Sequence, residues 1–289
     1  MTSTSLQIAV PVTSTKRRGA RKRSEISKLT LRNLNLGLDE TVNLMEWLAV
    51  DMDALSCSVF ADPNFGGFGQ RVRERLPRLT GMGVTARLAT IARIIADVAP
   101  DPDHQAYQSL SEHRSDIVRQ WAVYAIHAIP GLLLDERLAR TKRFAADPNM
   151  TVRECAWMAF RPHLAVDIDA GVDSLHSWVG SADPNVRRFA IEVTRPRSVW
   201  GKHLAALKKE PATCLSLLEP VKADHSRYVR TAVANWLNDA SKSQPEWVLS
   251  VCDRWRSDRN LRTDWIIGRA LRSYRAAAER RGHGRACYR

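Results

Sequence analysis

Long hydrophobic runs are missing from this sequence of 289 residues. No apolar run approaches the roughly 18 residues that a membrane-spanning helix requires. The apolar stretch near the start, residues 8–12, is too short for the core of a secretory signal, and its positive charges follow it rather than precede it. We therefore expect a cytoplasmic protein without a membrane partner.

Closely spaced cysteines are missing as well. The five cysteines lie far apart, with no Cys-x-x-Cys pair and no histidines at a matching distance: Cys57, Cys155, Cys214, Cys252 and Cys287. Zinc sites and disulfide frameworks both depend on close, patterned ligands. The sequence therefore predicts free thiols and no bound metal.

Acidic residues are scarce at both ends of the chain. Residues 1–24 contain no acid, six positive charges fall between Lys16 and Arg23, and residues 269–289 hold seven arginines against Glu279 alone. These two ends account for nearly all of the net charge of +13, so the body between them is almost neutral. We expect residues 1–24 to be a disordered basic tail and residues 275–289 a second basic tail. Each is either a solvated appendage or a salt-sensitive contact to phosphates.

Residues 25–82 are expected to form an N-terminal helical segment, because apolar residues from Leu31 to Leu48 approximate a period of 3.6. A Gly-rich stretch at residues 65–69 interrupts it. This stretch lacks the Lys-Ser/Thr pair of a nucleotide-binding loop and follows no predicted strand. We therefore expect a flexible connector, and no cofactor.

A Val-Arg step marks the rest of the chain at a fixed distance. Arg119, Arg153 and Arg187 are each 34 residues apart, and Arg230 follows after 43. Such a period is the signature of a helical solenoid, and no alternating β pattern competes with it. The sequence predicts an all-α, HEAT-like helical repeat solenoid over residues 83–274, with a concave and partly basic face.

The repeated residues have a mechanical interpretation. The Asp of each opening, helped by Pro, is expected to end one helix and cap the next. The Val and the following small residue are expected to face the neighbouring helix. The repeated arginines are expected to lie along the next repeat with their heads in water, or, for Arg187, to tie neighbouring helices together.

Trp200 stands apart from the other tryptophans, most of which are expected to pack between repeats. It follows a Pro-containing loop and lies among cations, where an indole can stack on a sugar or base. Residues 187–209 carry seven cations against Glu192 alone. If Arg188 and Arg195 point to the concave face they form a phosphate-binding strip; the role of Arg197 is left open.

Asp239 has two interpretations. It lies near the end of a predicted helix with no basic partner one turn earlier, which is unfavourable for a carboxylate in the field of the helix dipole. That cost is more tolerable when the group does chemistry. In the alternative, Asn238 and Asp239 cap the following turn, and spacing alone does not decide.

Residues 186–197, followed by Trp200, and residues 228–239 together resemble the DNA alkylation-repair superfamily of HEAT-like glycosylases. The sequence is most similar to the AlkC branch, with AlkD more distant. The resemblance is strong from about Asp147 to Trp255, weaker back to Arg87 and absent from both tails.

The resemblance implies a DNA glycosylase that acts as a monomer, lies on the nucleoid when bound, and removes N3-alkylated bases such as 3-methyladenine from duplex DNA. Members of this family grip the backbone and leave the lesion in the duplex. By resemblance, Asp239 and Glu192 face the lesion nucleotide and Trp200 stacks on the backbone sugar. Arg188 and Arg195 contact phosphates, and Lys202 of the same basic run is assigned with them.

One position departs from the AlkC-like pattern. Those enzymes carry a Glu four residues before an Arg-Pro step, whereas here Arg161-Pro162 is kept and Trp157 stands in place of the acid. Glu154, three residues upstream, is a possible substitute. Without it, the activity or the substrate has shifted.

A HEAT-type scaffold that binds a protein partner or undamaged nucleic acid without catalysis is the alternative hypothesis. The two hypotheses differ in one geometric expectation. Catalysis requires Asp239, Glu192 and Trp200 to converge on one concave surface.

Overall fold

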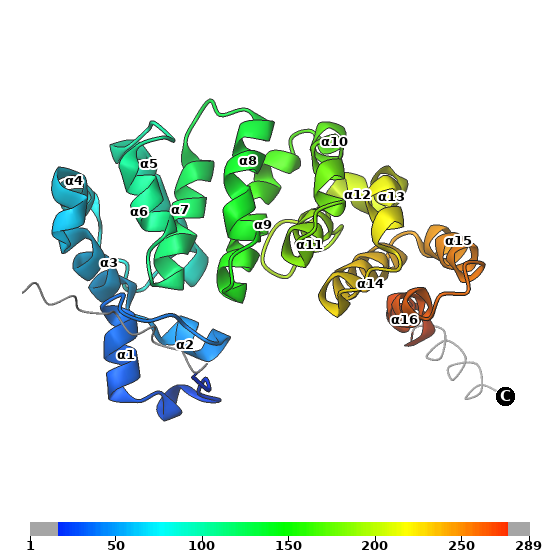
Figure 1. Ribbon diagram of the computed structural model, residues 1–289, viewed down its shortest axis with the longest axis horizontal. Helices are drawn as coiled ribbons and strands as arrows, with labels where there is room; N and C mark the ends of the chain where they lie inside the picture. The colour runs from blue at the N-terminus through cyan, green and yellow to red at the C-terminus, as the bar shows by residue number, and fades with distance from the viewer. Residues whose placement is uncertain (1–16, 277–289) are drawn as a thin grey trace, which may run out of the picture.

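The computed structural model describes residues 17–276 and shows a curved stack of helical pairs (Figure 1). No β-strand occurs within this range, so the predicted all-α repeat solenoid is confirmed. The N-terminal elements are η1 (Arg23–Glu25), α1 (Lys28–Asn35), α2 (Leu44–Ala49), α3 (Met52–Ala61), η2 (Pro63–Phe65) and α4 (Gly66–Arg75). The first repeat helices are α5 (Val84–Val98), α6 (Gln105–Ser111), α7 (Asp116–Ala128), α8 (Leu134–Ala145), α9 (Met150–Leu164), α10 (Ile168–Val179) and α11 (Pro184–Val193). The remainder are α12 (Ala205–Lys209), η3 (Pro211–Cys214), α13 (Leu215–Leu218), η4 (Glu219–Val221), α14 (Arg227–Ser241), α15 (Pro245–Arg256) and α16 (Leu261–Ala270).

One helix of each pair belongs to an inner row. In chain order, α5, α7, α9, α11, α14 and α16 each pack on the next, and α6, α8, α10 and α15 pack against them from the outer side. The predicted spacing explains this row, because the repeated valines are all buried: Val118, Val152, Val186 and Val229. A buried alanine follows each one about a turn later, and a small side chain lets adjacent helices approach closely: Ala122, Ala156, Ala190 and Ala232.

The aspartates of the repeat openings do not all cap helices. Asp183 caps α11, as predicted, by accepting a hydrogen bond from the backbone N–H of Asn185. The caps of α9 and α14, however, are Asn149 and Ser226, so the expectation for the other openings is wrong. Asp147 and Asp224 lie two residues before those caps, where their carboxylates meet arginines of the preceding repeat.

Two of the repeated arginines, Arg119 and Arg187, tie neighbouring repeats together, and their side chains are mostly buried rather than in water. Arg119 donates from Nε to Oδ2 of Asp147 at 2.8 Å, and Arg187 donates from Nε to Oδ2 of Asp224 at 2.7 Å. Each pair joins one repeat to the next, which confirms the tie expected of Arg187. Arg153 instead donates to the backbone carbonyl of Asp147, in the loop before its own helix.

The Gly-rich stretch is helical, which corrects the expected flexible connector. Residues 66–75 form α4, which packs on α3. Gly69 serves close packing, because a Cβ atom there would lie 2.5 Å from the carbonyl oxygen of Phe60. Gly66 also has a positive φ of 44°, a conformation that side-chain-bearing residues rarely adopt.

Part of the expected disordered tail is held against the N-terminal helices. Arg17 donates from Nη2 to Oε2 of Glu46 at 2.9 Å, and Asn43 donates to the carbonyl of Ala20 at 2.8 Å. The remainder of that prediction, residues 1–16, lies outside the described residues, as do residues 277–289 with Cys287. No helix between residues 17 and 276 combines the length and apolar character needed to cross a bilayer.

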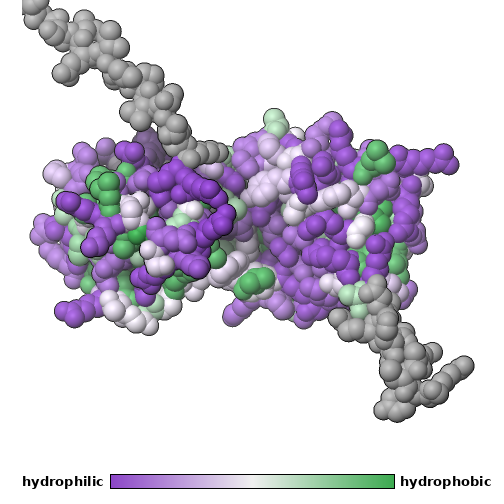
Figure 2. All heavy atoms as spheres, turned by 90° about the horizontal axis from the view of Figure 1, so that it is seen from below, coloured by the Kyte–Doolittle hydropathy of each residue, from purple (hydrophilic) through white to green (hydrophobic). Residues whose placement is uncertain are grey.

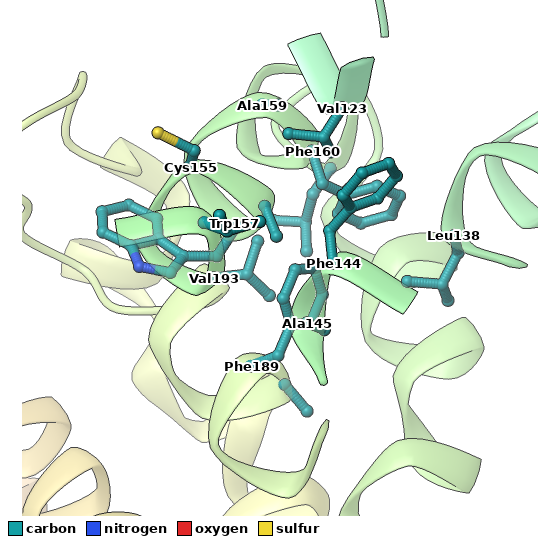
Figure 3. Close-up of a cluster of buried hydrophobic side chains, with 14 of the residues drawn as sticks. Val123, Leu138, Phe144, Ala145, Cys155, Trp157, Ala159, Phe160, Phe189 and Val193 are labelled. Carbon is teal, nitrogen blue, oxygen red and sulfur yellow. The ribbon is translucent and has the colours of Figure 1, made fainter. Parts of the chain in front are cut away.

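A cluster of buried hydrophobic side chains fixes α9 between α8 and α11 (Figure 3). Phe144, Phe160 and Phe189 form its centre, and Trp157 lies at its edge. Buried aromatic side chains of this kind contribute most of the packing energy at a helix junction. The rings therefore hold α9, with the Glu154–Trp157 turn, at a defined rotation.

The side chain of His127 is buried in this junction in its neutral form. Thr141 donates its hydroxyl hydrogen to the carbonyl of Arg137, so the 2.8 Å contact between Thr141 Oγ1 and His127 Nε2 requires the histidine to donate. Nδ1 has no hydrogen-bond partner among the described residues. Burial, followed by the charges of His163 and Arg137, lowers the pKa of His127 well below its ordinary value of 6.5.

We expect the protein to lose stability below pH 6.5. Protonation is harder in the folded than in the unfolded chain, so stability is complete above 6.5 and declines as the pH falls toward the folded pKa of His127. The decline is at most about 1.4 kcal/mol per pH unit for one group. Denaturant unfolding of the protein and of His127→Gln at pH 7.5 and 5.0 measures it. An equal pH dependence in both proteins would contradict the assignment.

Candidate active site

An alternating series of charges crosses the inner helices α9, α11 and α14. We call it the charge ladder, and its members in order are Glu154, Arg188, Glu192, Arg195, Asp239 and Lys242. Arg188 Nη2 lies 2.7 Å from Glu154 Oε1 and 3.4 Å from Glu192 Oε1. Arg195 Nη1 lies 3.0 Å from Glu192 Oε2.

Asp239 lies at the far end of the ladder. Its Oδ2 accepts hydrogen bonds from Nε and Nη2 of Arg195 at 2.9 and 2.7 Å, and its Oδ1 accepts one from Lys242 Nζ at 3.2 Å. These two cations offset its poor position near the end of α14. Neither Asp239 nor Asn238 caps the following turn, because Asn238 donates across to the carbonyl of Ala270 on α16. The capping alternative is therefore wrong.

The two ladder arginines are largely buried and remain charged. Burial disfavours the charge of Arg188, but Glu192 and Glu154 outweigh it and raise its pKa above the ordinary 12.5. Burial likewise opposes the charge of Arg195, and Glu192 with Asp239 raises its pKa. The ring of Tyr228 stacks 4.2 Å from the guanidinium of Arg188 and supports it further.

The contacts of Arg188 and Arg195 differ from those of a phosphate-binding strip. Carboxylates at 2.7–3.0 Å already neutralise both guanidiniums. Arg197, which the sequence left open, instead donates to the carbonyl of Asp239 and the hydroxyl of Ser243. Within residues 17–276, neither Arg197 nor the exposed Lys202 pairs with a carboxylate. Their charges are available to an anion.

Arg161 anchors the loop between α11 and α12 that carries these two cations and Trp200. Its guanidinium donates to the carbonyls of Val193 and Arg195 at 2.6 Å each and to that of Lys202 at 3.1 Å. Burial and the charge of Arg195 lower its pKa to about 10. Three backbone contacts join both ends of the loop, so the loop has a fixed position relative to α9. Sequence reasoning kept Arg161-Pro162 as a motif but missed this role.

Two hollows meet at Glu154 and Trp200. A polar hollow of about 170 Å³ is lined by residues of α9, α11, α14 and the anchored loop, among them Glu154, Trp157, Glu192 and Trp200. An apolar hollow of about 280 Å³ is lined by α2, α5 and α9 and again by Glu154 and Trp200. Trp200 is 53% exposed, as its place in the sequence predicted. The face that Figure 2 shows is mainly hydrophilic, with scattered hydrophobic side chains.

Of the three residues expected to be catalytic, two line the polar hollow. Glu192 and Trp200 do so directly, together with Arg188 and Arg195. Asp239 is joined to them through Arg195 rather than by lining the hollow itself. Glu192 and Trp200 therefore share one hollow with Asp239 behind Arg195, and the convergence of all three on one concave surface stays a prediction.

Fold and site together define a HEAT-like helical repeat protein with a hollow on its inner row that carboxylates, guanidiniums and an indole line. Residues 161–274 match the profile of the family described as DNA alkylation repair enzyme. This match confirms the resemblance to the DNA alkylation-repair superfamily over a segment that contains Glu192, Trp200 and Asp239.

Solved structures support the same relationship. The chain is similar to the alkylpurine DNA glycosylase AlkC of Pseudomonas fluorescens, solved bound to DNA with an abasic-site analogue. The TM-score is 0.64 and the sequence identity is 26%, and the match covers 89% of this chain and 65% of the AlkC chain. AlkD2 of Streptococcus mutans shares the fold, with TM-score 0.50 and 20% identity over 76% of this chain and 98% of the other. The uncharacterized protein YhaZ of Bacillus subtilis is 43% identical over 115 residues, 40% of this chain. The chain spans about a third of YhaZ and 65% of the AlkC chain.

Proposed function

We propose that this protein binds duplex DNA and releases N3-alkylated bases such as 3-methyladenine by hydrolysing the N-glycosidic bond. The observation that carries the proposal is the polar hollow, in which carboxylates and a half-exposed indole lie beside Arg197, a cation that has no carboxylate partner among the described residues. Similarity to AlkC, which was solved with abasic DNA, agrees with it.

Hydrolysis of the N-glycosidic bond of an alkylated base requires few groups beyond those that line the polar hollow. An alkylated base that carries a positive charge is already a good leaving group, so the enzyme mainly stabilises an oxocarbenium-like sugar and places a water molecule. Fixed carboxylates supply that stabilisation, and the face of the Trp200 indole attracts a cationic sugar. In this proposal Glu192 and Asp239 supply fixed negative charges close to the sugar, and Arg197 and Lys202 hold flanking phosphates.

Base release from methylated duplex DNA by the purified protein tests the proposal directly. Heat-independent release of 3-methyladenine, identified by mass spectrometry, is the expected result. DNA binding without release of any base would instead favour the non-catalytic scaffold, for which the charge ladder acts only as a tie between repeats.

Arg197→Ala and Lys202→Ala are each expected to weaken binding to all duplex sequences alike. Each should also reduce the salt slope of log K by about one unit, because one phosphate contact is lost. Binding measured between 50 and 200 mM salt, with the exposed Lys142→Ala on α8 as the control, gives the slope. Slopes equal to that of the control would remove both cations from the DNA contact.

A further inference from the structure

The three carboxylates of the charge ladder are not equally accessible. The side chain of Glu154 is 28% exposed, whereas those of Glu192 and Asp239 are only 5% and 7% exposed. Glu154 also lines both hollows, whereas Glu192 lines only the polar one. A group that acts on a bound nucleotide has to reach it, and Glu154 is the ladder carboxylate best placed to do so.

Trp157 holds this carboxylate in place. Its indole Nε1–H donates to Glu154 Oε2 at 2.8 Å, while Arg188 Nη2 donates to Glu154 Oε1 at 2.7 Å. The two residues are three positions apart on α9 and so lie on the same side of the helix. Because the indole is buried at the edge of the core cluster, its N–H has a fixed direction (Figure 3).

We propose that Glu154 is a catalytic carboxylate of this site and that Trp157 is the residue that positions it. The proposal rests on the glycosylase function above. In this proposal the site keeps a carboxylate although Trp157 stands where relatives carry an acid. The carboxylate is that of Glu154, about one turn earlier on the same helix, and Trp157 holds it in place.

The remaining acceptor capacity of Glu154 suits this role. Each carboxylate oxygen accepts one hydrogen bond from the protein, which leaves a lone pair on each for a ligand or water. In the reaction, the bond between the sugar C1′ and the base nitrogen breaks, and its electron pair neutralises the cationic base. Water adds to C1′, and its proton passes to Glu154 and then to solvent. The fixed negative charge stabilises the positive sugar between these events.

Glu154→Gln keeps the size of the side chain and removes its charge. We expect the single-turnover rate of 3-methyladenine release to fall about 100-fold, with unchanged affinity for DNA that holds an abasic-site analogue. A matched control exists, because Trp255 Nε1 donates to Glu219 Oε1 at the same 2.8 Å, away from both hollows. Glu219→Gln should therefore leave base release unchanged.

Trp157→Phe keeps an aromatic ring and removes the N–H donor. We expect an approximately tenfold lower rate, again without loss of abasic-DNA affinity. In the Glu154→Gln background the same change should have little further effect, because there is no carboxylate left to position. A purely structural role for Trp157 would lower the rate equally in both backgrounds.

The outcomes separate this inference from the proposed function. Base release by the unchanged protein together with a Glu154→Gln rate within about threefold of Glu219→Gln would overturn the role of Glu154 and leave the glycosylase function standing. No release of any alkylated base by the unchanged protein would overturn the function itself, and the inference with it.

Discussion

Replacing Asp239 with asparagine is expected to lower the rate of 3-methyladenine release by about 100- to 1,000-fold, the usual cost of removing one preorganised electrostatic group from an active site. Asparagine has the same shape but no charge. Arg195 would keep an acceptor at this position but would lose the opposing charge at 2.7 Å, so the site would become more positive. A more positive site disfavours an oxocarbenium-like sugar.

The control for Asp239→Asn is Asp224→Asn. Asp224 also accepts two hydrogen bonds from one arginine, Arg187, at 2.7 and 2.9 Å, but it lies in a structural tie between repeats. Single-turnover rates and thermal melting of both variants distinguish chemistry from folding. Equal loss of base release in the two variants would show that Asp239 acts only through stability.

Removing Arg195 is expected to have the largest effect on stability. Arg195→Ala leaves the buried carboxylates of Glu192 and Asp239 without their shared partner, and breaking a buried ion pair in this way costs about 3 kcal/mol or more. Arg187→Ala is the comparison, because it strands Asp224 alone. We expect the loss in unfolding free energy to be smaller for Arg187→Ala.

A double variant tests whether the loss of stability in Arg195→Ala comes from buried negative charge. Adding Asp239→Asn to Arg195→Ala removes one of the two buried negative charges that have lost Arg195, so the double variant should recover part of the lost stability. Urea unfolding of the single and double variants gives the coupling energy. Additive losses would mean that the ladder contributes through packing rather than through charge.

The sequence predicts the inner row because burial there repeats along the chain. Val118, Val152, Val186 and Val229 mark four inner helices by local spacing alone, and Trp200 is exposed because a Pro-containing loop precedes it. The burial of the valines and the exposure of Trp200 depend on residues close by in the sequence, and the sequence alone therefore predicts them.

The partners of charged groups were not predictable in this way. Arg195 meets Asp239 across 44 positions, and Arg187 meets Asp224 across 37, so the pairing depends on how repeats stack. A local count of cations indicated an excess of positive charge on residues 187–209. The structure shows that Asp239 and Glu154, from outside that run, neutralise part of it. The close packing of Gly69 was likewise not predictable from local sequence, because its packing partner Phe60 belongs to another helix.

The loop that carries Trp200 contributes part of the one irregular interval in the repeat. Eleven residues, 194–204, separate α11 from α12, whereas three separate α9 from α10. Because α11 ends sooner after Arg187 than α9 does after Arg153, the loop lengthens the interval from Arg187 to Arg230 by only three residues, and the other six lie between the start of α12 and Arg230. Arg161 holds this loop to its neighbour. The array can carry a chemically distinct loop at one junction while its inner row continues on both sides, since α9 packs on α11 and α11 on α14.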